Sequence, residues 1–466
     1  MQALVIVVFS LIFLLGLFRP GLSAACGMTM FSVEQMLQGF VNALRSTKLG
    51  LVFINAVVLI ITGVCAARVT FRVQRPLLGL GNSALYSIVA LLVWSMLTIG
   101  WTPSQEKGMQ SILENIPYMV MLAVVCPFLL HDMRTADSFC RSLLLVTTVA
   151  SALVLVNPEF VNRWGRLGFA IGFENERSNS LALGELGGIA MMTGLLLRDQ
   201  AGRVRIFWNC MRAAGMLIGL ILSIRSGSRG QMFFAVGVAA AFFPVAAPVK
   251  DLRRFLLTLV GLALLGGATI LLLNTLLMGF EAKRFTLEEL LYGQSSTQGR
   301  LQNVLVLLNE WARNPIYWIF GIGYYAFSSL YSGKLDPYSH VLIADALLEL
   351  GLPGMLTLGG ATAFAVRDYR RLYRTISNWP SARASTATLA ALASYYMLLA
   401  NKQGYLWGSG ILFLLMVVPG RLLARLELDP EFDYQQFEAE SRAAELQEDE
   451  LVDVSTHETI AAMGAR

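Results

Sequence analysis

Charged residues and metal-ligand patterns are scarce in this sequence. Asp, Glu, Lys and Arg make up 14% of its 466 residues, whereas soluble proteins have about 25%. The five cysteines are scattered, without a CxxC pair or metal-ligand spacing. Walker A, HExxH and GxSxG patterns are also absent. The composition excludes a cytosolic enzyme and a secreted disulfide scaffold. The missing motifs argue against ATP hydrolysis, zinc proteolysis and metal-dependent sugar transfer, so we predict no metal and no cofactor.

Long apolar runs are abundant instead. The chain is 56% hydrophobic, with a mean hydropathy of +0.60, and a membrane-spanning helix needs about 20 apolar residues. Runs near this length predict an all-α polytopic membrane protein with about twelve transmembrane helices. They lie at about 3–18, 50–67, 84–101, 114–130, 139–156, 181–197, 207–224, 231–247, 255–278, 340–366, 387–400 and 407–420.

The distribution of charge predicts the orientation. Short loops rich in Arg and Lys follow the second, sixth, eighth, tenth and twelfth runs, and such loops favour the cytoplasmic side. We therefore expect both termini to be cytoplasmic. Residues 427–466 hold twelve acidic and two basic residues, which predicts a disordered acidic tail. Residues 1–426 form the predicted membrane domain, and 279–339 form a long outer loop within it.

Several arginines depart from this charge rule because they fall in predicted outer loops. Arg225 and Arg229 flank a turn of small residues, and Arg300 opens a segment with helical periodicity at 299–313. Arg166 and Arg177 bracket a glycine-rich outer loop and are secondary candidates. Guanidinium groups bind phosphate oxygens in pairs. These residues are therefore either sites for an anionic ligand or ordinary interfacial anchors.

The segment 299–313 itself repeats apolar residues at helical spacing, with Leu301, Val304, Leu305 and Leu308 on one stripe. This pattern predicts an amphipathic helix that lies on the membrane or caps the bundle. Asn314-Pro315 should end it.

His340 is the candidate general base, because it alone of the three histidines falls on the outer face. An interfacial histidine that reaches water is the alternative. Glu185, Asp345 and Glu349 fall within or near predicted spans, where ionisable groups are costly and usually functional. Three roles are open for Asp345 and Glu349. They pair with His340 or with an arginine, they belong to a proton path, or they are merely interfacial residues.

These outer-face segments together resemble motifs of the O-antigen ligase and polymerase superfamily. SGSRGQ at 226–231 resembles its Ser-Arg-Gly motif, and QGR at 298–300, with NP and GIG at 314–323, looks like its long periplasmic loop. SHVLIADALLELGLPG at 339–354 resembles its His-x-x-Leu…Glu-x-Gly-x-x-Gly segment. The resemblance covers about 160–360 in motif order. One departure is Val341, where many members have Asn.

The resemblance implies a bacterial inner-membrane glycosyltransferase of the helical, GT-C-like kind with a periplasmic active site. Its donor would be a glycan on undecaprenyl pyrophosphate and its acceptor a sugar of the lipid A core, with membrane lipids as surroundings and no nucleic acid as partner. Arg229 and Arg300 would hold the pyrophosphate, and His340 would deprotonate the acceptor hydroxyl. Arg225 is our addition, from its neighbourhood.

Two alternatives stay open. A polymerase would use a second lipid-linked repeat as acceptor, and the residues above do not distinguish it from a ligase, although the overall pattern favours the ligase. A secondary transporter would explain the intramembrane acids. Transport should depend on those acids and an ion gradient, whereas transfer should depend on His340 and the arginines. The sequence shows no internal repeat of the kind many transporters have.

Overall fold

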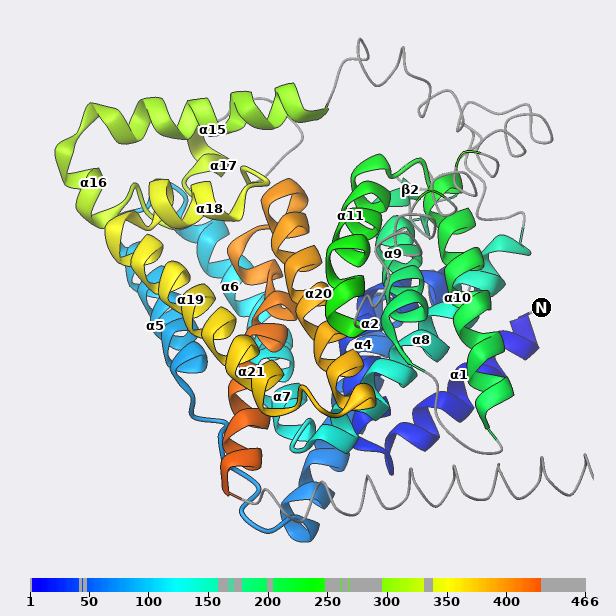
Figure 1. Cartoon of the computed structure of the whole chain (residues 1–466). Helices are drawn as coiled ribbons and strands as arrows, with labels where there is room; N and C mark the ends of the chain where they lie inside the picture. The colour runs from blue at the N-terminus through cyan, green and yellow to red at the C-terminus, as the bar shows by residue number, and fades with distance from the viewer. Residues whose placement is uncertain are drawn as a thin grey trace, which may run out of the picture.

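The protein is a bundle of α-helices capped at one end by a helical layer (Figure 1). The computed structural model describes residues 2–41, 44, 48–157, 167, 169–170, 178–198, 204–247, 260, 267, 296–330 and 338–428. Its only strands in these ranges are β1 (Phe169–Ala170) and β2 (Ser178–Asn179), which pair antiparallel with Phe169 opposite Asn179. The predicted helical fold class is therefore confirmed for the described residues.

Helices contain most of the described residues. Their bounds are α1 (Gln2–Gly16), α2 (Pro20–Phe40), α4 (Lys48–Arg72), α5 (Ser83–Leu97), α6 (Gln105–Val120), α7 (Cys126–Leu129), α8 (Met133–Leu155), α9 (Ser180–Leu196), α10 (Arg205–Arg225), α11 (Arg229–Ala246), α15 (Ser296–Arg313), α16 (Pro315–Phe320), α17 (Phe327–Leu330), α18 (Leu342–Ala344), α19 (Gly351–Thr375), α20 (Pro380–Gln403) and α21 (Gly410–Leu428). Short π-helices occupy Met121–Val125 and Asp345–Glu349, and 3₁₀ turns occupy Thr98–Gly100 and Leu406–Gly408.

Six helices among the described residues are long and apolar enough to cross a membrane. They are Phe53–Arg72, Ser83–Gly100, Gln105–Leu129, Met133–Leu155, Arg205–Arg225 and Arg229–Ala246. The chain is thus a helical protein of membrane type, and the figure of twelve spans stays a prediction. Apart from residues 260 and 267, the run at 255–278 lies outside the described residues.

Helix α2 was not predicted from the sequence. It contains Glu34, Gln35 and Gln38 and so interrupts the apolar pattern, yet it is buried along most of its length. Asn55 of α4 donates a hydrogen bond of 2.7 Å to Glu34. A helix inside a bundle can carry polar groups that neighbouring helices satisfy, whereas a search for apolar runs finds mainly helices that face lipid.

The extra helix changes the course of the N-terminus. We call the end of the bundle that holds Arg68 and the turn 129–132 the basic end. The Phe18 ring lies 4.4 Å from the guanidinium carbon of Arg68, so the α1–α2 junction lies at the basic end. In Figure 1, α1 runs obliquely from the N-terminal mark toward this junction. The side of the membrane on which the N-terminus lies stays a prediction.

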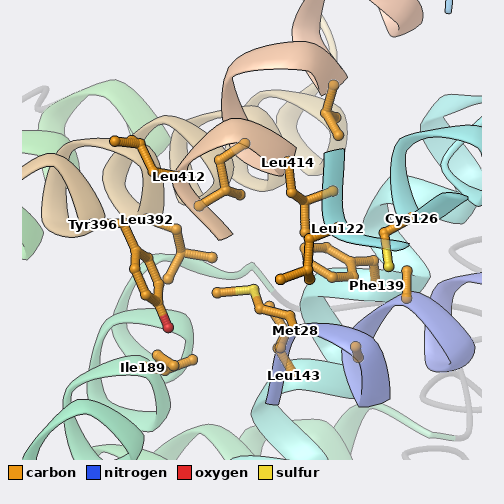
Figure 2. Packing of buried hydrophobic residues seen from close by; sticks show 14 of the residues in the cluster. Met28, Leu122, Cys126, Phe139, Leu143, Ile189, Leu392, Tyr396, Leu412 and Leu414 are labelled. Carbon is orange, nitrogen blue, oxygen red and sulfur yellow. The ribbon is translucent and has the colours of Figure 1, made fainter. Parts of the chain in front are cut away.

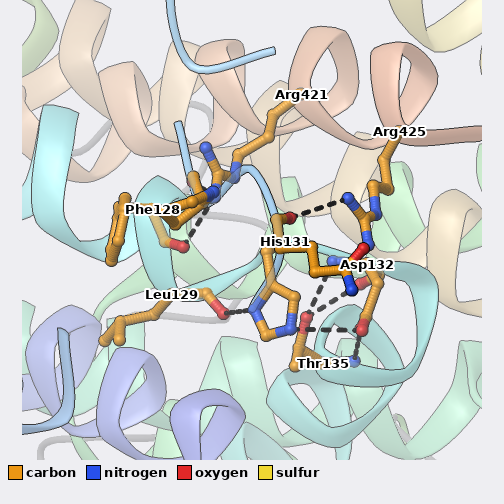
Figure 3. Close-up of polar contacts among 9 residues, drawn as sticks. Phe128, Leu129, His131, Asp132, Thr135, Arg421 and Arg425 are labelled. Carbon is orange, nitrogen blue, oxygen red and sulfur yellow. Dashed lines mark hydrogen bonds and ion pairs between the residues drawn. The ribbon is translucent and has the colours of Figure 1, made fainter. Parts of the chain in front are cut away.

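At the basic end, polar side chains form hydrogen bonds with residues in the turns between helices (Figure 3). Asp132 caps α8 by accepting a 2.7 Å hydrogen bond from the Thr135 amide, and it lies 3.2 Å from His131 Nε2. Burial raises the pKa of Asp132, but hydrogen bonds and charge from His131 and Thr135 outweigh it and lower the pKa to about 2. Arg421, only 1% exposed, donates to the carbonyls of Pro76 and Phe128. Arg421 was predicted as a loop residue, but it is a buried part of α21.

The core joins helices that are far apart in the sequence (Figure 2). Met28 of α2, Phe139 of α8, Ile189 of α9, Leu392 of α20 and Leu414 of α21 belong to one buried cluster. This packing sets α9, α11 and α20 against one another, and their ends carry the polar residues considered below.

The predicted amphipathic helix at 299–313 is present as α15, which ends at Arg313 as predicted, and Asn314 caps α16 immediately after it. Figure 1 shows α15 lying across the end of the bundle opposite the basic end, which we call the α15 end. The predicted stripe does not form the packing face. Leu301, Leu305 and Leu308 are 60%, 45% and 40% exposed, whereas Leu307 is fully buried. Helical spacing gives the width of an apolar stripe but not which edge of it meets the protein.

Candidate functional site

The turn between α10 and α11 places Arg225 and Arg229 at the α15 end. Arg225 is the last residue of α10 and Arg229 the first of α11, and both are half-buried. Gly227 between them has φ +66°, a conformation that costs glycine little. Ser226 Oγ donates to the Ser223 carbonyl at 2.8 Å. The small residues of the motif therefore build a tight turn that brings the two guanidinium-bearing residues to one end.

Other small residues of this motif make room for neighbouring helices. Ser228 Oγ donates to the Ser180 carbonyl at the start of α9, at 2.8 Å. A Cβ atom added to Gly230 would lie 2.4 Å from Nζ of Lys402. The glycine after Arg229 thus allows a lysine from α20 to approach the backbone of α11.

Residues 401–403, the C-terminal turn of α20, connect the predicted segments. The Lys402 ammonium donates to Gln231 Oε1 at 2.6 Å, and Gln231 Nε2 donates to Gln403 Oε1 at 2.5 Å. The Ile343 amide, three residues after His340, donates to Asn401 Oδ1 at 3.0 Å. One helix end therefore contacts both the Ser-Arg-Gly segment and the histidine segment.

The charge of Arg300 also acts on this turn. Lys402 lies beyond the apolar part of α20 at 387–400. Burial, followed by the positive charge of Arg300, lowers the pKa of Lys402 from 10.5 to about 8. Arg300 is half-buried in α15, and the first residues of that helix lie toward the α11 side (Figure 1). The charges of Arg300 and Lys402 thus act on each other beside the first turn of α11, which carries Arg229, and an anionic ligand would relieve their repulsion.

His340 sits in a strained turn at the same end. Its φ is +66°, which is uncommon for a residue with a side chain and persists where surrounding contacts hold it. Ser339 Oγ hydrogen-bonds to the carboxyl of Asp345 and accepts from the Val341 amide at 3.1 Å. The residues on both sides of His340 are therefore held by hydrogen bonds, and Ser339 links this turn to Asp345.

A cavity of about 400 Å³ lies between α2, α9 and α20, and His340 and Gln403 both line it. Glu185 of α9 also lines the cavity and accepts a 2.6 Å hydrogen bond from Tyr396. The rings of Tyr338 and His340 have their centroids 4.4 Å apart. Gln403 therefore has cationic residues on one side and the cavity with the imidazole on the other.

The carboxyl group of Glu349 holds backbone amides of the segment that precedes it. It is 3% exposed, and its two oxygens accept backbone hydrogen bonds from Tyr325 and Phe327, each at 3.0 Å. The Gly323 amide donates to the Glu349 carbonyl at 2.8 Å. The Gly-Ile-Gly segment and Glu349 thus join the outer loop to the start of α19.

The structure brings most of the predicted site residues to the α15 end, although by different routes. Arg300 acts electrostatically on Lys402, and Arg229 precedes Gly230, which approaches Lys402; Arg225 lies at the end of α10, and His340 and Glu185 line the cavity. His131 lies at the basic end. Arg166 and Arg177 lie outside the described residues.

Sequence reasoning missed Lys402. It follows the predicted span at 387–400 on the predicted outer face, so it breaks the charge rule as the arginines do. That signal could have identified it. Its contact with α11, 171 positions away, could not be read from the sequence.

No model of a known protein family matches this sequence, and no curated protein matches it either.

Proposed function

We propose that the protein transfers a glycan from a polyprenyl pyrophosphate to a sugar hydroxyl, as an O-antigen ligase does. The observation that carries this proposal is the gathering of Arg229, Arg300 and Lys402 around the end of α20, next to the cavity that His340 lines. Fixed cations beside a candidate base are what displacement of a pyrophosphate requires.

The reaction follows from these groups. His340 accepts the proton of the acceptor hydroxyl, and the hydroxyl oxygen forms a bond to the anomeric carbon of the donor sugar. The bond from this carbon to the phosphate oxygen breaks, and the pyrophosphate leaves with the electron pair. The cations stabilise the negative charge that develops on the leaving group. A single displacement inverts the configuration at the anomeric carbon.

An apolar cavity below the α20 turn supports a lipid-linked donor. It measures about 510 Å³ and lies between α11, α19, α20 and α21, with Phe242, Met397 and Leu398 in its lining. Asn401 donates to the Met397 carbonyl, so this cavity begins one helical turn from residues 401–403. A polyprenyl chain in it would place its pyrophosphate near Lys402.

The location of the reaction belongs to the same proposal. We place the protein in a bacterial inner membrane, with about twelve spans, the basic end toward the cytoplasm and the α15 end in the periplasm. Lipid A core is then the acceptor of a ligase, and a second lipid-linked repeat is the acceptor of a polymerase.

The test is a transfer assay with purified protein and an undecaprenyl-pyrophosphate-linked glycan, without ATP. Rough lipid A core is offered in one reaction, and donor alone in another. Glycan on lipid A supports the ligase, and ladders on the carrier lipid support the polymerase. The absence of both products, with folded protein and authentic substrates, would contradict glycan transfer and favour the transporter.

A further inference from the structure

The cavity that His340 lines differs chemically from the cationic region beside it. Among the described residues that line it there is no Lys or Arg, and Glu185 contributes a carboxyl group. Such a lining disfavours a phosphate, because the carboxylate repels it and no guanidinium or ammonium group balances the repulsion. The pyrophosphate and the occupant of this cavity are therefore different chemical groups.

The lining suits a neutral ligand with many hydroxyl groups. Glu185, Gln403 and Tyr396 offer acceptors and donors at different points of the wall. Tyr338 and Tyr405 add aromatic faces, with ring centroids 4.7 Å apart. The electron-rich face of an aromatic ring attracts the C–H groups on the flat side of a sugar. The volume of about 400 Å³ lies at the small end of ligand sites, which span about 300–1,000 Å³.

The position of Gln403 defines the boundary between the two regions. Its side chain accepts from Gln231, which also accepts from Lys402, and it lines the cavity as well. A sugar in the cavity would have its hydroxyl groups near His340 and its nearest cationic neighbours across Gln403. This order matches a displacement in which sugar and pyrophosphate separate.

We propose that this cavity binds a neutral sugar ring, with Glu185 and Tyr396 as a hydrogen-bonding pair and Tyr338 and Tyr405 as aromatic walls. The inference rests on the proposed glycan transfer for the identity of the sugar substrate. The acceptor is the expected source of the ring because His340 lines the cavity, and the first sugar of the donor has the same chemistry.

The first experiment measures binding without catalysis. Core oligosaccharide freed from lipid A is added to purified protein, and saturation-transfer NMR gives its Kd. Glu185→Gln replaces a carboxylate acceptor by a neutral amide, and Tyr396→Phe removes the hydroxyl that donates to Glu185. Each variant should therefore weaken binding about tenfold or more. Tyr395→Phe is the matched control, because Tyr395 is the adjacent buried tyrosine and is not among the residues of the cavity wall. Thermal unfolding checks that each variant folds.

The second experiment measures steady-state kinetics with donor and acceptor varied separately. A KM that rises for the acceptor alone assigns the ring to the acceptor, and a KM that rises for the donor alone assigns it to the donor; both support a sugar site. If wild type binds the oligosaccharide but transfers nothing, the proposed function fails and the sugar site stands. If wild type transfers glycan and the two variants match it in both Kd and KM, the sugar site is overturned.

Discussion

The ammonium of Lys402 lies 2.6 Å from Oε1 of Gln231, although 171 residues separate them in the chain. The contact joins the C-terminal turn of α20 to the first turn of α11, two residues after Arg229. A side chain at Gly230 would overlap the end of the lysine, which would then have to shift. This single relationship places a cation that the sequence did not single out beside those that it did.

Lys402→Met should lower kcat/KM for the donor by roughly 10- to 100-fold, because it removes a charge-assisted contact with the pyrophosphate. Steady-state transfer with the donor varied measures this effect. Lys107→Met is the matched control: Lys107 is exposed near the start of α6 and donates to Ser328 of α17 at 3.2 Å. Equal losses of kcat/KM in both variants would show that the effect comes from positive charge at this end in general and not from a specific contact of Lys402.

Donor binding should weaken as the pH rises through about 8. Burial and the charge of Arg300 lower the pKa of Lys402 to about 8, so the protonated form that attracts pyrophosphate is present below this pH and lost above it. Above about pH 8 the Kd of the donor should rise with pH, and the slope should approach an increase of about tenfold per pH unit. Binding of undecaprenyl pyrophosphate between pH 6 and 9.5 measures it.

The control for this profile is Lys402→Arg, because a guanidinium group keeps its charge throughout the range. Its profile should be flat between pH 7 and 9.5 in the assay. A fall as steep as that of wild type would assign the pH dependence to another group.

His340→Ala should reduce kcat by about 10²- to 10⁴-fold, the usual contribution of a general base. KM for the donor should change little, since the cations hold the pyrophosphate. His131→Ala is the comparison, because His131 pairs with Asp132 at the basic end. Undiminished transfer by the His340 variant would remove the histidine from the mechanism.

Glu349→Ala should lower stability rather than affect one kinetic constant. It leaves the buried amides of Tyr325 and Phe327 without their acceptors, at a cost of about 2 kcal/mol or more. The Tm in detergent measures this effect. Glu349→Gln should lie between wild type and Glu349→Ala, because an amide retains one acceptor oxygen. An unchanged Tm for Glu349→Ala, with loss of transfer, would instead place Glu349 in the chemistry.

The long apolar helices and the amphipathic helix α15 were predictable. Apolar runs identified the helices at 84–101, 139–156 and 207–224, and helical spacing identified α15. Helix α2 escaped because its partners, such as Asn55 for Glu34, satisfy its polar residues inside the bundle. A polar residue is costly in a membrane unless another group forms a hydrogen bond with it, and the sequence alone does not show that partner.

The residue types of the site can be read from the chain: guanidinium groups and one imidazole on the predicted outer face, with glycine and serine where chains come close. Their partners follow from the packing of the helices. This packing added Lys402 and Gln403, made Glu349 a backbone acceptor, and set Glu185 with His340 around one cavity. Local spacing determines a helix face or a tight turn because those contacts lie within a few residues. A site between α9, α11 and α20 depends on packing across the whole chain, which no short pattern records.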